Sequence, residues 1–143
     1  MITKAQNIYR SDDNISNYQN YRKKVKPSEN CVFCSDEKPS FNPRSLNLRH
    51  LRIIENSFPY DFWDMKKVQK HLMIIPLNHI DCVSKLNSNE QKELNLVMAH
   101  FSDAGYDIFV RSPQSTIKSI EHLHFHLIKT EDAKLNILVE YSD

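Results

Sequence analysis

The chain is 143 residues long, which is close to the commonest size of a single domain. It carries 19 Lys and Arg against 18 Asp and Glu, so its formal net charge is +1 and no overall attraction to nucleic acid or a membrane surface is expected. A phosphorylated ligand would therefore have to be bound by a local site. No apolar run approaches the roughly 20 residues that span a bilayer, and the first residues lack the apolar segment of a signal peptide.

Glycine and cysteine usage exclude further classes of protein. The chain has one glycine, Gly105, whereas the dinucleotide-binding fingerprint and the P-loop each need several glycines to bring backbone close to phosphates. Its three cysteines, two of them in Cys31-Val32-Phe33-Cys34, do not make a disulfide framework. We therefore expect a cytoplasmic protein.

Residues 1–30 are polar and are expected to stand apart from a main domain over residues 31–143. Apolar and aromatic side chains recur there at steps of three and four residues, at Ile15, Tyr18, Tyr21 and Val25. This spacing is typical of one face of a helix. A short helix and an irregular N-terminal arm are both compatible with the segment.

The main domain is predicted to be α+β. One helix is expected to begin with Ser88 as N-cap and Gln91 at the third position of a capping box, and to end at Gly105 with positive φ. Its buried face is predicted to comprise Leu94, Val97, Met98 and Phe101. Strands are predicted at Leu46–Glu55, His71–Ile75, Tyr106–Arg111, Glu121–Lys129 and Lys134–Tyr141. Without a regular alternation of strands and helices, these elements favour a mostly antiparallel sheet of about five strands with one main helix.

The stretch from 122 to 128 alternates between histidine and apolar residues, with His122, His124 and His126 on one face of the predicted strand. Three explanations compete: a solvated strand, a zinc site, and a division in which one histidine is a structural ligand and the others handle an anionic substrate. The first and third histidines would lie roughly 13 Å apart on a straight strand, so one ion cannot easily bind all three. The division between two roles is therefore favoured.

The cysteine pair has the two-residue gap that lets Cys31 and Cys34 bind one zinc ion. A redox pair is the alternative, but such a pair normally opens a helix, and the residues that follow Cys34 do not resemble one. Zinc is favoured, and two histidines must complete the site. The histidine-bearing stretches near 79 and 122 can supply them.

Three blocks in order resemble the histidine-triad (HIT) superfamily. The first is Asn30-Cys31-Val32-Phe33-Cys34, and the second runs from His71 through Pro76 to His79 and Ile80. The third, Ser119 to Ile128, contains the alternating histidines. A lone alternation of histidines would be a weak signal, but the three blocks and their spacing are strong. The resemblance implies the HIT-like fold.

The resemblance also implies a mechanism. The middle histidine, His124, would attack the α-phosphorus of a nucleotide ester, anhydride or phosphoramidate, a role that suits a neutral imidazole. His126 would donate to the phosphate or leaving group, and Ser119 would donate to the phosphate. His71 matches a histidine that lines the nucleotide pocket. In members of the family a backbone carbonyl fixes the tautomer of the nucleophilic histidine.

In zinc-bearing members of the family, the metal ligands correspond to Cys31, Cys34, His79 and His122. Such a zinc ion would be structural, because four protein ligands leave no position for a water molecule. This assignment leaves His124 and His126 for chemistry.

The chain departs from the family pattern at three places. Arg111 stands where Asn is usual, and Ile117-Lys118 where Gly-Gln precedes the serine. The family's ribose-binding Asp falls on Trp63, and Asp64 takes this role only with a one-residue shift; an exposed loop carboxylate is the alternative. Arg111 and Lys118 are either solvated surface charges or, by our hypothesis, favour substrates with extra phosphates.

These features predict a nucleotide hydrolase or transferase that acts through a nucleotidyl-histidine intermediate. Dinucleoside polyphosphates and nucleoside phosphoramidates are the expected substrates. The alternative is a nucleotide-binding regulatory protein with little catalytic activity. A small zinc-dependent interaction module would explain the cysteines but leave two histidines without a role. Many members of the family form homodimers, and neither a membrane nor a nucleic acid is expected as a partner.

Overall fold

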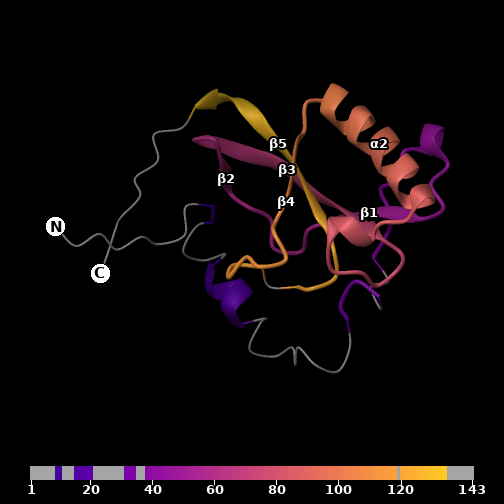
Figure 1. Ribbon diagram of the computed structural model, residues 1–143. Helices are drawn as coiled ribbons and strands as arrows, with labels where there is room; N and C mark the ends of the chain where they lie inside the picture. The colour runs from indigo at the N-terminus through magenta and orange to yellow at the C-terminus, as the bar shows by residue number, and fades with distance from the viewer. Residues whose placement is uncertain (1–8, 11–14, 21–30, 35–37, 119, 135–143) are drawn as a thin grey trace.

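One antiparallel sheet and one long helix make up most of the computed structural model, which describes residues 9–10, 15–20, 31–34, 38–118 and 120–134 (Figure 1). In chain order the elements are η1 (Arg44–Leu46), β1 (Leu51–Glu55), β2 (Phe62–Trp63), β3 (Lys66–Pro76), η2 (Val83–Lys85), α2 (Ser88–Asp103), β4 (Asp107–Val110) and β5 (Phe125–Lys134). This is the predicted α+β class, with the HIT-like arrangement of sheet and helix.

The sheet has the strand order β1-β3-β5-β4, all neighbours are antiparallel, and β2 pairs with the outer part of β3. The histidine-bearing strand β5 therefore lies between two neighbours. His126 faces Met73 of β3 on one side and Phe109 of β4 on the other. The backbone at this position is hydrogen-bonded to strands on both sides, which restricts its motion.

Both faces of the sheet are covered. On one face α2 packs against alternate strand residues in a core formed by Leu51, Ile53, Leu72, Ile74, Leu86, Leu94, Val97, Phe101, Leu123, Phe125 and Leu127. On the other face the segment around Phe33 packs against Ile54, Met73 and Ile75. Burial from both sides explains why residues 71–75 are continuously apolar except for His71. The predicted packing of the apolar face of residues 123–127 against the helix is confirmed.

The main helix carries a capping box, but one residue earlier than predicted. Asn87 rather than Ser88 is the N-cap, and its side chain accepts a hydrogen bond from the backbone nitrogen of Glu90 at 2.8 Å. The Glu90 carboxylate accepts in return from the Asn87 nitrogen at 2.9 Å. Asn and Ser are both good N-caps, so two adjacent candidates made the register ambiguous. The predicted end at Gly105 is confirmed, with φ at 90°.

Strand boundaries differ from the prediction in several places. The first strand begins at Leu51 instead of Leu46, because η1 ends at Leu46 and the next residue, Asn47, adopts a left-handed conformation that interrupts extended backbone. The strand predicted from His71 begins already at Lys66. The short β2 was not predicted, because its turn to β3 uses Asp64 and Met65 at positive φ and contains no glycine. The predicted final strand lies outside the described residues beyond Lys134.

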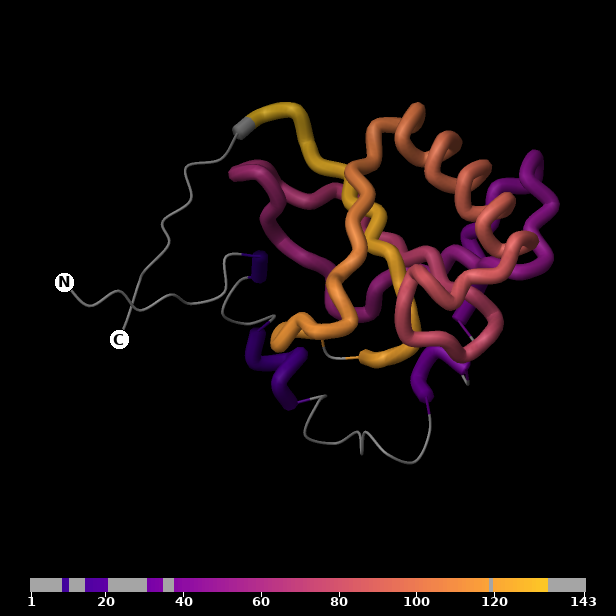
Figure 2. Tube along the Cα trace, viewed as in Figure 1, coloured from indigo at the N-terminus to yellow at the C-terminus, as the bar shows by residue number. Residues whose placement is uncertain are grey.

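The N-terminal part contributes two described segments. Residues 15–20 are helical, which agrees with the helical alternative for that portion, while residues 21–25 lie outside the described residues. The carbonyl of Tyr9 accepts hydrogen bonds from the backbone nitrogens of Asp61 and Phe62, at 2.6 and 3.0 Å. In Figure 2 both segments lie on the opposite side of the molecule from α2. Among the described residues, no helix is long and apolar enough to cross a membrane.

Candidate active site and metal centre

The three alternating histidines are buried on the face of the sheet opposite α2. His122, His124 and His126 are 1%, 8% and 6% exposed. Only His126 lies within β5, because His122 and His124 precede its first residue, Phe125. Burial of three imidazoles requires polar partners. Each has one, and the partners differ.

The ring of His124 is oriented by the backbone of its own segment. Its Nδ1 lies 2.9 Å from the carbonyl oxygen of His122. A carbonyl can only accept, so Nδ1 carries the proton and donates it. The other nitrogen, Nε2, then keeps its lone pair. This nitrogen is the one available for bonding to an electrophile.

A chain of hydrogen bonds fixes the tautomer of His126. The backbone nitrogen of Tyr60 donates to Nδ1 of His71 at 3.0 Å, so Nδ1 of His71 is an acceptor. His71 Nε2 lies 2.8 Å from His126 Nδ1 and donates to it. The proton of His126 consequently sits on Nε2, which is a donor. The amide nitrogen of Asn56 is farther from His71 Nε2, at 3.4 Å, and contributes little.

The environment holds these rings neutral near pH 7. Burial lowers the pKa of His71 to about 3, with the positive charge of Arg10 and the ring of His124 acting in the same direction. Burial also lowers the pKa of His126 well below its ordinary value. For His124, burial lowers the pKa, and the hydrogen bond to the carbonyl of His122 offsets part of this effect. A neutral His124 has the free lone pair that a nucleophile needs.

Residues from three separate segments meet in a compact cluster beside the histidine site. The ligand-type atoms of Cys31, Cys34, His79 and His122 all lie within 4.8 Å of one another. Sγ of Cys31 and Nδ1 of His122 are 3.3 Å apart, as are Sγ of Cys34 and Nδ1 of His79. The two Nδ1 atoms are 3.2 Å apart. Bond lengths in tetrahedral zinc sites imply edges of roughly 3.3 Å between two nitrogens and 3.6 Å between nitrogen and sulfur.

His122 is oriented for this cluster by a second contact. Its Nε2 lies 2.8 Å from the carbonyl oxygen of Pro76 and donates to it. Nδ1 is then unprotonated and points to the cysteines, and such a carbonyl partner is the usual support of a metal-binding imidazole. Two thiols and two imidazoles at these distances fit a tetrahedral metal ion. The four residues that the sequence nominated are therefore together in space and could hold one.

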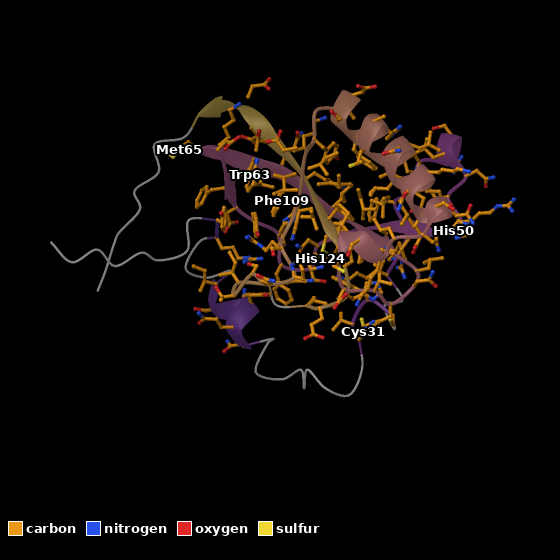
Figure 3. The ribbon with its side chains drawn as sticks, viewed as in Figure 1. Cys31, His50, Trp63, Met65, Phe109 and His124 are labelled. Carbon is orange, nitrogen blue, oxygen red and sulfur yellow. The ribbon has the colours of Figure 1, made fainter. Side chains whose placement is uncertain are left out.

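Stacked aromatic rings extend from the histidine site. Phe109 stacks on His126 with ring centroids 4.5 Å apart, and Trp63 stacks on Phe109 at 5.0 Å. Tyr60 stacks on His126 at 5.9 Å, and Tyr9 of the N-terminal segment stacks on Tyr60 at 4.6 Å. Figure 3 shows Trp63 and Phe109 side by side, with His124 between them and Cys31. This row of aromatic rings was not predicted, because its members come from three separate segments of the chain without a shared spacing.

Three cations surround the same histidines. Arg111 Nη2 donates to the hydroxyl of Tyr60 at 2.7 Å, and Nζ of Lys118 donates to the carbonyl of Asp81 at 3.0 Å. Their charges lower the pKa of His124, after the larger effect of burial. Arg10 has its guanidinium 4.7 Å from the centre of the Tyr60 ring. Arg10 was not identified in the sequence, where it is one of many basic residues in a polar segment.

The remaining nominated residues lie in different places. Asp64 is exposed in the turn between β2 and β3. Trp63, at the position of the family's ribose-binding carboxylate, donates its indole N–H to Asp107 at 2.7 Å. Ser119 lies outside the described residues.

No family model and no curated protein matches the sequence. Solved structures do match. A HIT family hydrolase from Clostridium thermocellum is 26% identical and superimposes with a TM-score of 0.50, covering 77% of this chain and 98% of that one. A histidine triad nucleotide-binding protein from Candida albicans is 19% identical, with a TM-score of 0.50 over 80% of this chain and 87% of that one. A hypothetical protein from Leishmania major is 18% identical, with a TM-score of 0.55 over 80% and 84% of the two chains.

A five-stranded antiparallel sheet with one covering helix, and three buried alternating histidines leading into its central strand β5, define a histidine-triad protein. The match to the hydrolase from Clostridium thermocellum, together with these histidines, shows that the chain belongs to the HIT superfamily. The two matches below 25% identity support the fold.

Proposed function

We propose that this protein is a nucleotide hydrolase or transferase in which His124 attacks the α-phosphorus of a nucleotide. The observation that carries the proposal is the hydrogen bond from His124 Nδ1 to the His122 carbonyl, 2.9 Å long. It leaves Nε2 as a lone-pair nitrogen in a site whose burial keeps the ring neutral. The name of the 26% identical structure, a HIT family hydrolase, agrees with this activity.

The proposed reaction has two steps. In the first, His124 Nε2 forms a bond to the α-phosphorus as the bond to the leaving group breaks, and the leaving group departs with its electron pair, accepting a hydrogen bond from His126 Nε2 or taking a proton from solvent. In the second, water or another acceptor attacks the same phosphorus, the bond to His124 Nε2 breaks, and the proton of the attacking group passes to solvent. The tautomer of His126, set through His71 and the backbone of Tyr60, supplies a donor at the required nitrogen. Ser119 is proposed to donate to the phosphate.

The expected substrates are dinucleoside polyphosphates or nucleoside phosphoramidates. Arg111 lies beside His126 and, with Lys118, adds positive charge around His124. Positive charge at this position favours a substrate with several phosphates or an anionic leaving group.

We assign a structural zinc ion to Cys31, Cys34, His79 and His122. The thiolate and imidazole donors and their spacing suit zinc. When bound, the ion would tie the segment around Cys31 to the two histidine-bearing segments. Four protein ligands leave no open position on the metal, so the chemistry at phosphorus is carried by the histidine site.

The decisive experiment is incubation with adenosine phosphoramidate and diadenosine polyphosphates, followed by mass spectrometry of the trapped protein. An adenylyl group on His124 and a loss of turnover of about 10⁴-fold or more in His124→Ala are expected. His100→Ala is the matched control, because His100 is exposed on α2. Turnover that survives His124→Ala would disprove the mechanism. Nucleotide binding without turnover in the wild type would instead favour the regulatory alternative.

The metal assignment is tested separately. Purified wild-type protein is expected to contain one zinc per chain, and Cys34→Ser to lose most of it. Cys82→Ser is the control, because Cys82 contacts Ser84 and is not among the clustered ligands. Zinc content that is equal in the two variants would contradict the assignment.

A further inference from the structure

Two arginines from distant parts of the chain meet at one aromatic ring beside the histidine site. The guanidinium of Arg10 lies 4.7 Å from the centre of the Tyr60 ring, and Arg111 donates to the hydroxyl of the same residue at 2.7 Å. The Tyr60 ring is itself stacked on His126, with centroids 5.9 Å apart. Both positive charges also lower the pKa of His126, so both act on the proposed reaction centre.

Arg10 is firmly positioned although it belongs to the N-terminal segment. Its Nε and Nη2 atoms donate to the carbonyl of Phe58 at 3.2 and 2.9 Å. Its guanidinium also lies 4.5 Å from the centre of the Tyr18 ring, so the group is sandwiched between two tyrosines. The neighbouring Tyr9 carbonyl accepts from the backbone of β2. A planar cation held in this way loses little entropy when it binds an anion.

The electrostatics of this arrangement are unfavourable in the absence of a ligand. Burial lowers the pKa of Arg10, and the nearby charge of Arg111 lowers it further, while Tyr60, Tyr18 and Asp61 act in the opposite direction. Two like charges gathered around one buried ring repel each other, and an anion bound between them relieves that repulsion. Arg10 also lowers the pKa of His71 and His126, so its field reaches the proposed catalytic imidazoles.

We infer that Arg10 and Arg111 form a second phosphate subsite, which binds the phosphates of a nucleotide beyond the one attacked by His124. The subsite rests on the proposed function for its choice of ligand and adds its preference: nucleoside polyphosphates over nucleoside monophosphates. The N-terminal segment is then part of the substrate site, because it supplies Arg10. Guanidinium groups suit this task, since each offers a planar fork of donors to phosphate oxygens.

A purely structural role for Arg10 makes a different prediction. If Arg10 only fastened the N-terminal segment to Tyr60 and Phe58, its replacement would affect all ligands equally. The informative variant is Arg10→Gln, which keeps hydrogen-bonding capacity toward the Phe58 carbonyl but removes the charge. Arg10→Lys restores a charge without the planar fork. Arg49→Ala is the matched control, because that side chain is exposed and is not among the charges that lower the pKa of His71, His124 or His126.

Binding is measured without turnover, as dissociation constants for AMP, ADP, ATP and inorganic tripolyphosphate. We expect wild-type affinity to rise from AMP to ATP, and Arg10→Gln to weaken ATP and tripolyphosphate about tenfold while changing AMP less than twofold. Arg10→Lys should recover part of the loss. Emission from Trp63, the one tryptophan, reports whether the segment stays in place, because Tyr9 stacks on it at 6.0 Å.

Several outcomes overturn the inference: equal wild-type affinity for AMP and ATP, equal losses for both in Arg10→Gln, or the same loss in Arg49→Ala. A shift in Trp63 emission combined with equal losses identifies the structural role. The proposed function fails by a separate result, which is turnover that does not depend on His124. The two failures are therefore distinguishable.

Discussion

His122 and His124 are two residues apart on the same face, yet they keep the lone pair on opposite ring nitrogens. His122 donates Nε2–H to the carbonyl of Pro76 and turns Nδ1 toward the cysteines. His124 donates Nδ1–H to the carbonyl of His122 and leaves Nε2 free. The residue type is the same and the burial is similar. The position of one carbonyl oxygen decides which nitrogen can react.

Under the proposed function, this difference separates the proposed metal ligand from the proposed nucleophile without a change in side-chain chemistry. Around His122, ligand atoms from three segments converge on one point. Around His124 and His126, each imidazole has a partner that fixes its tautomer, and the neighbouring charges are positive. One end therefore suits a cation and the other an anion, as the proposed metal site and phosphate chemistry require. Backbone geometry, rather than residue identity, divides the two roles.

The largest expected effect is that substitutions of these two residues remove different properties of the protein. His122→Ala should lose the metal and lower Tm by on the order of 10 °C or more, because the segment around Cys31 loses its tether. His124→Ala should keep the metal and Tm but lose turnover by about 10⁴-fold or more. Zinc analysis, thermal unfolding and turnover are measured on both variants. If either variant lost both properties, the two ends could not be regarded as separate sites.

A smaller effect is expected on the pH dependence of the free energy of unfolding, through His71. The pKa of His71 is about 3 in the folded chain, against 6.5 in the unfolded chain. Above pH 6.5 neither state binds the proton, so His71 makes no pH-dependent contribution. As the pH falls below 6.5 the unfolded state takes up the proton and the folded state does not, and this difference persists down to about pH 3.

The free energy of unfolding should therefore decrease with falling pH by about 1.4 kcal/mol per pH unit from this residue alone. His71→Gln should remove that part of the slope, whatever its effect on stability at neutral pH. Urea unfolding near pH 7, 6 and 5 measures the slope, and ionisation of the metal cluster cancels between the two proteins. An unchanged slope in His71→Gln would mean that His71 is protonated inside the folded chain.

The sequence predicted correctly those features that a regular spacing of similar residues indicates. The spacing predicted a buried face of α2 at Leu94, Val97, Met98 and Phe101; three of these are buried, and Met98 is partly buried against the same core. The alternation at residues 122–127 predicted a histidine face and an apolar face, which the two sides of the sheet separate. Such periodic patterns can be recognised because the fold buries every second residue, or every third and fourth.

The aromatic and cationic surroundings of the histidines could not be predicted. Tyr60 and Arg10 lie fifty residues apart, and nothing in either local sequence indicates that they meet. The β2–β3 turn was missed because Asp64 and Met65 adopt positive φ without a glycine to announce it. Contacts between distant segments depend on how the whole chain folds, and the spacing of residues within one segment does not reveal which other segment it will contact.

The smallest effect is expected at Phe33, the buried ring that contacts both ends of the comparison. Its centroid lies 5.8 Å from that of His122 and 5.1 Å from that of His124, edge-on in each case. Phe33→Leu should reduce stability by about 1 kcal/mol and turnover several-fold, because the His124 ring loses the wall that limits its motion. Zinc content should not change, since the four ligand residues remain.

Phe101→Leu is the matched control for that variant. Phe101 is equally buried, but it packs in the α2 core beside Tyr106, on the other face of the sheet. The two variants should lose similar stability, and only Phe33→Leu should lower turnover. Equal turnover in both would show that His124 is held by its hydrogen bond to the His122 carbonyl alone. The contact of Phe33 with His122 and His124 would then contribute to stability only, and would not link the His122 site to turnover at His124.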